Sequence, residues 1–187
     1  MSKSFIVLDT ETTGLPQTPG FGVWYHPSDT RHYDSSRVIQ VAVVSETESF
    51  MWYIKPEDFQ IENSEFHGIT QDIALSGVSW DTMIAELMDI LGRYDVIVGH
   101  NILFDLHVIA AELYRREQSV IATQLLNIPY ECTMCLGKLY MKSTRFPKLV
   151  DLYEHIYKKK IQQTHDAIED CKTTFDCYIG MKHLPDR

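Results

Sequence analysis

The chain has 187 residues, 44% of them hydrophobic and 23% charged, and its formal net charge is −9. This length fits one domain, residues 1–187, whose core needs no disulfide or structural metal, and the composition is that of an ordinary globular protein. The negative charge argues against a protein that coats nucleic acid through a broad basic surface.

No apolar run approaches the ~20 residues of a membrane span, and the N-terminal residues lack the features of a secretory signal. We therefore expect an intracellular protein, in the cytoplasm or the nucleus, with no membrane partner. Cys132 and Cys135 form one C-x-x-C, but Cys171 and Cys177 form no second, so tetrahedral zinc spacing is absent. Packed, reduced thiols are expected, with a redox role for Cys132 and Cys135 as the lesser alternative.

The first predicted element is a short buried strand, Phe5–Leu8, rich in apolar and β-branched residues. Six polar or small residues follow it: Asp9, Thr10, Glu11, Thr12, Thr13 and Gly14. The two carboxylates lie where an open α/β sheet forms its ligand crevice, and buried carboxylates are costly unless a positive group compensates them. No Arg or Lys lies within this turn, so a divalent cation is the leading expectation.

A long irregular segment follows, about Thr12 to Arg37, and connections of this length are usually functional or mobile. Its main part, residues 17–37, is predicted to be an insertion on the substrate side. Aromatic residues with interleaved arginines suit base stacking there: Phe21, Trp24, Tyr25, Tyr33, Arg31 and Arg37. The alternative is a loop that covers the sheet edge and buries its own aromatic side chains.

The remaining elements predict one α/β domain with strands first and then alternating strands and helices. Val38–Val44 and Ser49–Ile54 are expected to pair as an antiparallel hairpin. Helical spacing of apolar residues follows, with Asp81 as the expected N-cap after Ser79. The later predicted elements are a strand at Val96–Val98 and helices at about Phe104–Arg116, Leu149–Tyr157 and Asp166–Met181.

Two of these later elements carry further acids. Asp105 comes just after the strand Val96–Val98, where it either joins Asp9 and Glu11 or only complements a helix dipole. His165 and Asp170 are five residues apart, so they cannot share one helix face. We expect His165 just before the last helix and Asp170 within its first turns, facing the sheet.

Together, Asp9, Glu11, Asp105 and Asp170 suit a two-metal site with oxygen ligands. Two Mg²⁺ or Mn²⁺ ions ~3.5–4 Å apart can clamp the attacking and leaving oxygens of a phosphoryl displacement. A base for the attacking water is also needed, and an imidazole such as that of His165, with an ordinary pKa near ~6.5, suits that role.

At these residues the chain resembles the DEDD superfamily of 3′–5′ exonucleases, the DnaQ-like group. The three motifs stand in order along nearly the whole chain: Asp9-x-Glu11-Thr12-Thr13-Gly14, Gly99-His100-Asn101-x-x-Phe104-Asp105 and His165-x-x-x-x-Asp170. His67-Gly68-Ile69-Thr70 adds a lesser match. One subgroup carries a tyrosine four residues before the last aspartate, where this chain has Asp166, so the chain resembles the histidine subtype (DEDDh).

The resemblance implies a ribonuclease H-like fold, with a mixed five-stranded sheet flanked by helices, and release of nucleoside 5′-monophosphates from a 3′ end. Asp9 would bridge two metals, Glu11 and Asp170 would share the one that holds the attacking water, and Asp105 would support the other. His165 would be the base.

Substrate contacts follow from the same resemblance. Thr12, Thr13 and the backbone around Gly14 would cradle the terminal nucleotide. Leu15 would wedge against its base and Phe104 would stack nearby, although core packing is an equal alternative for both. His67 and Asn101 would lie at the terminal sugar or phosphate.

The expected partner is a single-stranded 3′ end, with DNA favoured over RNA; a polymerase partner and a homodimer stay open. The alternatives are an exoribonuclease of the same fold, a non-catalytic domain that binds nucleic acid or a polymerase, and an endonuclease of the ribonuclease H type. Residues 138–160 carry a local charge of about +5 in this acidic chain. They are either a solvated surface or a strip that tracks phosphates.

Overall fold

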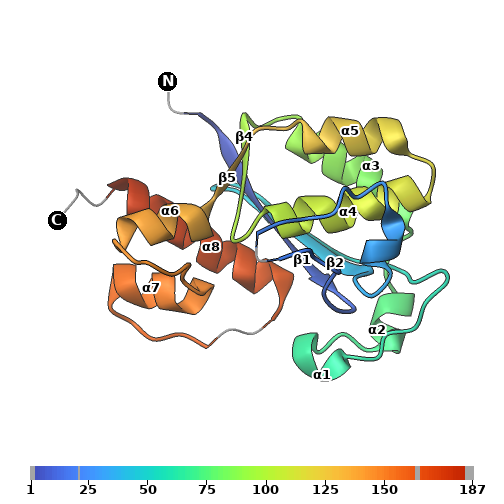
Figure 1. Cartoon of the computed structure of the whole chain (residues 1–187), viewed down its shortest axis with the longest axis horizontal. Helices are drawn as coiled ribbons and strands as arrows, with labels where there is room; N and C mark the ends of the chain where they lie inside the picture. The colour runs from blue at the N-terminus through green and yellow to red at the C-terminus, as the bar shows by residue number, and fades with distance from the viewer. Residues whose placement is uncertain (1–2, 21, 163–164, 184–187) are drawn as a thin grey trace.

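A five-stranded mixed sheet forms the centre of the molecule (Figure 1). The structure is a computed structural model that describes residues 3–20, 22–162 and 165–183. The strands are β1 (Phe5–Thr12), β2 (Val38–Val44), β3 (Ser49–Tyr53), β4 (Val96–Gly99) and β5 (Tyr130–Cys132). Their order is β3-β2-β1-β4-β5, with β1, β2 and β3 antiparallel and with β4 parallel to both β1 and β5. The predicted mixed sheet and its antiparallel hairpin are confirmed.

Helices cover both faces of this sheet. They are α1 (Ser64–His67), α2 (Gln71–Leu75), α3 (Trp80–Leu91), α4 (Leu103–Arg115), α5 (Ser119–Leu126), α6 (Thr133–Tyr140), α7 (Leu149–Tyr157) and α8 (Ala167–His183), with a 3₁₀ helix η1 (Thr30–Tyr33). In the described part of the chain, none of these helices has the length and apolar character needed to cross a membrane.

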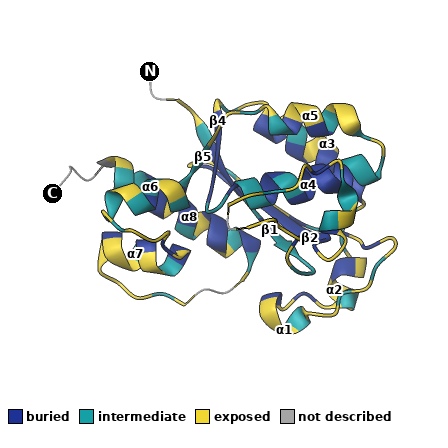
Figure 2. Cartoon of the chain, viewed as in Figure 1, coloured by how far each residue is buried: buried dark blue, intermediate teal, exposed yellow. Residues whose placement is uncertain are grey.

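The hydrophobic core has two layers, one on each face of the sheet, and alternate side chains of β1 belong to different layers. Ile6 and Leu8 face α3, α4 and α5, whereas Val7 packs toward α8, as expected for a strand whose successive side chains point to opposite faces. All of β2 is buried, and Figure 2 shows the central strands as dark blue between partly exposed helices. The sheet is therefore covered on both sides, and its chemistry must lie at the strand ends.

Strand β1 is longer than predicted, because it continues through the polar residues to Thr12. The ladder to β2 becomes irregular only between Glu11 and Thr12. Asp9 and Glu11 therefore lie within the strand, two residues apart, so their side chains share the face that α8 covers. Thr10 points to the α4 side, where its hydroxyl donates to Asp105 (2.8 Å).

Two further expectations need correction. The N-cap of α3 is Ser79, whose hydroxyl accepts from the Thr82 backbone N–H, and not Asp81. Cys171 and Cys177 are buried as expected, but Cys135 is exposed because α6 turns it to the same open face as Leu139. All four cysteines are free.

The irregular segment packs on α4 rather than standing free. Tyr33 is fully buried, and its hydroxyl donates to the Tyr25 carbonyl oxygen (2.6 Å) and contacts His107 Nδ1 (3.0 Å). Tyr33 and Arg37, which is buried in an ion pair with Glu112, are therefore not available for base stacking. Trp24 lies against the rings of Phe104 and His107, and Phe21 lies outside the described residues.

Candidate active site

One cavity of about 490 Å³ collects nearly all the predicted site residues. Its walls include the five predicted catalytic residues and six of the seven predicted substrate contacts: Asp9, Glu11, Asp105, His165, Asp170, Thr12, Thr13, Gly14, Leu15, His67 and Phe104. Asn101 is the exception. It takes a left-handed backbone conformation (φ 69°), and its carbonyl oxygen accepts from the Phe104 N–H at the start of α4.

Three elements far apart in sequence supply the acids. Asp9 and Glu11 come from β1, Asp105 from the first turn of α4, and Asp170 from the first turn of α8. Because β4 lies parallel to β1 and immediately beside it, the helix that follows β4 starts at the same sheet edge. The convergence expected from the sequence is therefore observed.

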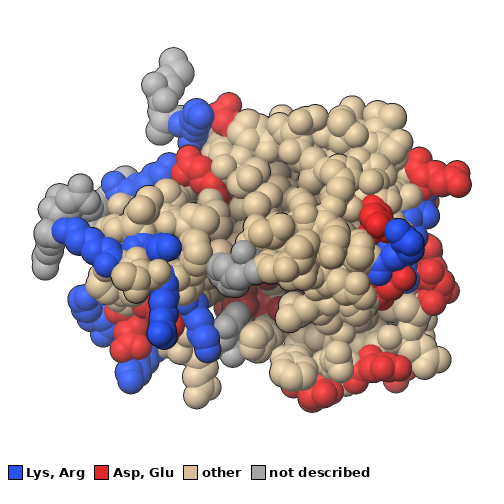
Figure 3. All heavy atoms as spheres, viewed as in Figure 1, with Lys and Arg blue, Asp and Glu red and all other residues tan. Residues whose placement is uncertain are grey.

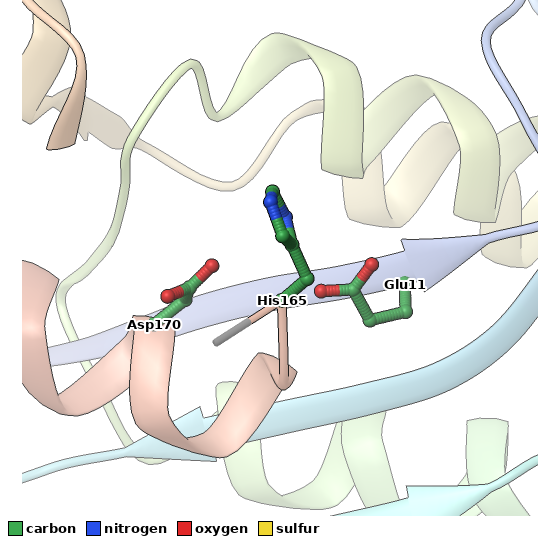
Figure 4. Close-up of side chains that lie close together, drawn as sticks. All are labelled: Glu11, His165 and Asp170. Atoms are coloured by element: carbon green, nitrogen blue, oxygen red, sulfur yellow. The ribbon is translucent and has the colours of Figure 1, made fainter. Parts of the chain in front are cut away.

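Glu11, His165 and Asp170 form the tightest group. One ligand atom from each lies within 4.8 Å of the others, and Figure 4 shows the two carboxylates on β1 and α8 with the imidazole beside them. His165 is exposed and has φ 49°, just before the start of α8. It thus occupies the shoulder that its spacing from Asp170 predicts.

The acids strongly perturb one another. Burial raises the pKa of Asp9 well above its usual range, and the carboxylates of Asp105, Asp170 and Glu11 raise it further. Burial, together with Asp170 and Asp105, raises the pKa of Glu11 to about 8. Burial also raises the pKa of Asp105 to about 7, although the bond from Thr10 acts in the opposite direction.

This charge pattern fits a site for divalent cations. In the described part of the chain, every charged group that shifts the pKa values of Asp9 and Glu11 is itself a carboxylate. A structural ion pair would instead place Arg or Lys among them. The four carboxylates form a set of hard oxygen donors, which Mg²⁺ and Mn²⁺ prefer, and one imidazole lies beside them.

His67 is buried and belongs to the lining of the cavity. Its Nδ1 accepts from the Ile69 backbone N–H (3.1 Å), so the proton of the neutral ring is on Nε2. That Nε2 is buried and has no hydrogen-bond partner among the described residues. Burial lowers the pKa of His67, which keeps the ring neutral, and an unpaired buried donor in a cavity wall indicates a ligand acceptor.

Sequence reasoning missed three residues that shape the cavity: Asn63, Phe66 and His100. Asn63 Nδ2 donates to the Thr13 carbonyl oxygen (2.8 Å) and so joins the segment before α1 to the end of β1. Phe66 is 68% exposed and Leu15 is 76% exposed, so Leu15 is not a core residue. The neighbouring His67-Gly68 motif was the available signal for Phe66.

His100 has a positioning role. Its Nε2 donates to the Pro147 carbonyl oxygen (3.1 Å), and its Nδ1 contacts the Thr133 hydroxyl (3.0 Å). Burial lowers the pKa of His100 to about 4, so the ring is neutral. It thereby fastens the loop before α7 to the end of β4.

Comparison with known proteins places this geometry in a family. The sequence matches the model of the RNase_T family, described as Exonuclease, over residues 6–178. It is 25% identical over 182 residues to the DNA polymerase III subunit epsilon of Rickettsia prowazekii, covering 94% of this chain and 72% of the relative. The Escherichia coli subunit epsilon is 24% identical over 185 residues, covering 94% and 70%.

Solved structures share the fold at low identity. Exonuclease I of E. coli in complex with a dT13 oligonucleotide superposes with a TM-score of 0.70 and 18% identity over 99% of this chain. The chain spans only 42% of that protein's length. A 3′-exonuclease that recognises a histone mRNA stem-loop gives a TM-score of 0.65 and 15% identity, over 99% of this chain and 66% of that one. With its ribonuclease H-like sheet and its acid cluster, the chain belongs to the DnaQ-like Exonuclease (RNase_T) family.

Proposed function

We propose that this exonuclease hydrolyses the terminal phosphodiester bond at the 3′ end of single-stranded nucleic acid and releases nucleoside 5′-monophosphates. The observation that supports this most directly is the meeting of four carboxylates and one imidazole in a single cavity. A cavity of about 490 Å³ falls in the range of small-ligand sites, ~300–1,000 Å³. That size suits one terminal nucleotide rather than a duplex.

Asp9, Glu11, Asp105 and Asp170 would hold two divalent ions, Mg²⁺ or Mn²⁺, with Asp9 shared between them. When bound, such ions supply Lewis-acid stabilisation of the attacking and leaving oxygens. Burial, followed by the neighbouring carboxylates, raises the pKa values of Asp9 and Glu11, and a bound cation would offset both effects. Thr10 keeps the Asp105 carboxylate turned toward β1 through its hydrogen bond.

His165 would act as the general base. A water oxygen would attack the phosphorus of the terminal nucleotide while His165 accepts a proton from that water. The bond from this phosphorus to the O3′ of the preceding nucleotide would break, and that O3′ would leave with the bonding electron pair and take a proton from solvent. The exposed position of His165, next to Glu11 and Asp170, lets it exchange that proton with solvent before the next cycle.

The remaining wall residues would select a terminal nucleotide. His67 Nε2–H would donate to the sugar or phosphate, because it has no protein acceptor. Leu15 and Phe66 expose large apolar surfaces at the cavity and would contact the base. Thr12, Thr13 and the backbone at Gly14 would line the rest of the nucleotide.

We favour DNA over RNA as the substrate, because the relatives found by sequence are named as subunits of a DNA polymerase.

Matched DNA and RNA oligonucleotides, labelled at the 5′ end, should be digested with Mg²⁺ or Mn²⁺ and the products resolved by length. We expect a ladder that shortens one nucleotide at a time, mononucleotides from a 3′-labelled strand, and no reaction with EDTA. His165→Ala should slow the reaction by roughly 10²–10⁴-fold.

Two outcomes would contradict the proposal. Internal fragments without mononucleotides would indicate an endonuclease, and binding of the strand without metal-dependent cleavage would indicate a non-catalytic domain. Faster loss of RNA than of DNA would leave the chemistry intact and reverse the substrate preference.

A further inference from the structure

The basic residues of this acidic chain are concentrated on one surface. Residues 138–160 hold seven of its 17 Lys and Arg side chains: Lys138, Lys142, Arg145, Lys148, Lys158, Lys159 and Lys160. Six of them are exposed, and Lys138 is half-buried. In Figure 3 most of the blue side chains lie over α6 and α7, and red carboxylate atoms are visible in the hollow beside them. We call these seven residues the basic surface.

The basic surface differs in its pairing from most of the other basic side chains that the structure describes, Lys3 and Lys55 being the exceptions. Arg31, Arg37, Arg93, Arg115, Arg116, Lys172 and Lys182 each lie within ion-pair distance of a carboxylate. Within residues 3–20, 22–162 and 165–183, none of the seven side chains of the basic surface does. Their charge is therefore available to an external anion.

The basic surface reaches the acid cluster through a second cavity of about 350 Å³. Residues 146–149 form one wall of this cavity, with Met134 nearby. The two cavities share Asp9, His100 and Asp170. A strand whose last nucleotide lies in the first cavity therefore has an exit that opens toward Lys148.

The loop at this exit is held in place rather than loosely attached. His100 donates to the Pro147 carbonyl oxygen (3.1 Å). The Ser143 hydroxyl donates to the Arg145 carbonyl oxygen (2.8 Å) and accepts from the Arg145 N–H (3.1 Å). A fixed loop loses little conformational entropy when a ligand binds to it.

An aromatic ring stands within this basic loop. Phe146 is 38% exposed and lines the second cavity. The Lys138 ammonium lies over its ring, 4.4 Å from the centroid, a cation–π contact. This contact holds Lys138 beside the loop, so that Lys138 and the cations of residues 142–148 lie on one surface.

We propose that the basic surface binds the single strand on the 5′ side of the scissile nucleotide. The strand leaves the acid cluster through the second cavity and passes its phosphates along Lys148, Arg145 and Lys142. This inference rests on the proposed function, which places the 3′ nucleotide in the first cavity. The contacts are to phosphates, so they carry no sequence preference.

The test compares two double variants with equal change of charge. Lys142→Gln/Arg145→Gln removes two cations of the basic surface, and Lys3→Gln/Lys55→Gln removes two exposed cations outside it. The substrates are 3-nucleotide and 20-nucleotide strands that share the same 3′ sequence, at ~50 to 200 mM salt. Wild-type cleavage of both strands establishes the proposed function independently of the variants.

We expect Lys142→Gln/Arg145→Gln to lower kcat/KM for the 20-nucleotide strand on the order of tenfold at ~50 mM salt, chiefly through KM. Its salt dependence should be shallower by about 1.4 in slope, since a single-strand phosphate contact contributes about 0.7. The loss should be smaller for the 3-nucleotide strand. The control variant should match wild type on both.

The inference is overturned if the two double variants lose the same activity, or if the loss is equal for both strand lengths. It is also overturned if Lys142→Gln/Arg145→Gln degrades the 20-nucleotide strand like wild type but fails to retain a polymerase that wild type retains. That last result would assign the basic surface to a protein partner.

Discussion

Asp9 is the residue where the demands of folding and of the proposed chemistry conflict most strongly. Its carboxylate shares the α8 face of the sheet with Glu11, and burial together with four neighbouring acids raises its pKa. Without a cation, this arrangement costs folding free energy. A neutral side chain of the same shape would relieve that cost and remove the charge that binds metal.

Asp9→Asn should therefore stabilise the metal-free protein and abolish the activity. We expect activity to fall on the order of a thousandfold, as for other groups that stabilise charge in a transition state, while thermal unfolding in EDTA moves to higher temperature. Asp89→Asn, at an exposed position on α3, is the matched control and should change neither quantity. Loss of activity accompanied by a less stable metal-free protein would show that Asp9 supports the fold instead.

The raised pKa values also predict how stability depends on pH. The pKa values of Glu11 and Asp105 are about 8 and about 7 in the folded chain, whereas unfolded carboxyls titrate near ~4. Between these two ranges of pH the folded chain therefore holds protons that the unfolded chain has released. Proton binding stabilises the folded chain there, and the free energy of unfolding falls as pH rises through the folded pKa values. The metal-free protein should unfold at lower urea concentration at about pH 8.5 than at about pH 6.5.

His100 does not contribute to the change in stability predicted between about pH 6.5 and about pH 8.5. Its pKa is lowered to about 4, so its effect on stability is confined to the range below the ordinary histidine pKa of ~6.5. Added Mg²⁺ or Mn²⁺ should reduce the fall in stability at high pH, because a cation favours the ionised carboxylates. Metal-free stability that stays level or rises between these pH values would contradict the pKa assignment.

At the scale of the elements, a buried charge cluster joins the start of β2 to α4. Glu112 is 2% exposed and lies within ion-pair distance of Arg37, Arg115 and Arg116. Arg37 also reaches Asp58 (2.8 Å). This cluster fixes the C-terminal end of the long irregular segment to α4.

Glu112→Ala should destabilise the protein by about 3–5 kcal/mol, because it leaves buried guanidinium groups without their shared carboxylate. Glu169→Ala, which breaks the exposed pair with Lys172, should cost less than about 1 kcal/mol. Urea unfolding of both variants gives the comparison. Equal costs for the two changes would mean that the cluster contributes no more than a surface pair.

The turn after β1 depends on close contact between backbones. A Cβ on Gly14 would lie 2.7 Å from the Ser35 carbonyl oxygen, whereas a Cβ on Gly20 would meet nothing within 4 Å. Gly14→Ala must shift the turn that lines the cavity, so we expect kcat/KM to fall about 10- to 100-fold. Gly20→Ala should retain wild-type kinetics, and equal kinetics for the two variants would contradict the role of the turn.

The elements that the sequence predicted and those it did not predict differ in length and in the regularity of their apolar pattern. Apolar periodicity predicted α3, α4, α7 and α8, and the apolar runs predicted β1, β2, β3 and β4. Periodicity missed α1 and α2, which have four and five residues, and β5, which has three, because such short elements show too few repeats of any period. It also missed α5 and α6, which have eight residues each. In α6, Gly137 interrupts the pattern where the helix packs closely on Leu152 and Pro147.

At the scale of the whole molecule, the sheet topology explains why the acids could be predicted and other wall residues could not. Asp9 lies on β1 and Asp105 follows β4, the parallel strand beside it, and the rule that ligands bind at such strand ends operates on sequence alone. Asn63 reaches the cavity through a tertiary contact, its bond to Thr13, which no local pattern encodes. Phe66 and His100 lie beside or within the motifs of the sequence, but neither motif shows that these two side chains line the cavity.

Acidic and basic side chains also occupy different parts of the whole molecule. The acids gather at the sheet edge, and the basic surface lies over α6 and α7 beside them (Figure 3). A chain with net charge −9 can therefore attract a polyanion locally while repelling it elsewhere. The proposed metal binding, the proposed hydrolysis and the proposed path of the strand all depend on the acid cluster.

Titration of the metal-free protein with Mn²⁺, followed by calorimetry, tests the acid cluster most directly. In the presence of a nucleoside 5′-monophosphate at about pH 8, where Glu11 is substantially ionised, the wild-type chain should bind two ions. Asp9→Asn should bind at most one, and Asp89→Asn should match wild type. Absence of saturable Mn²⁺ binding by the wild type, or two ions bound by Asp9→Asn, would contradict the account.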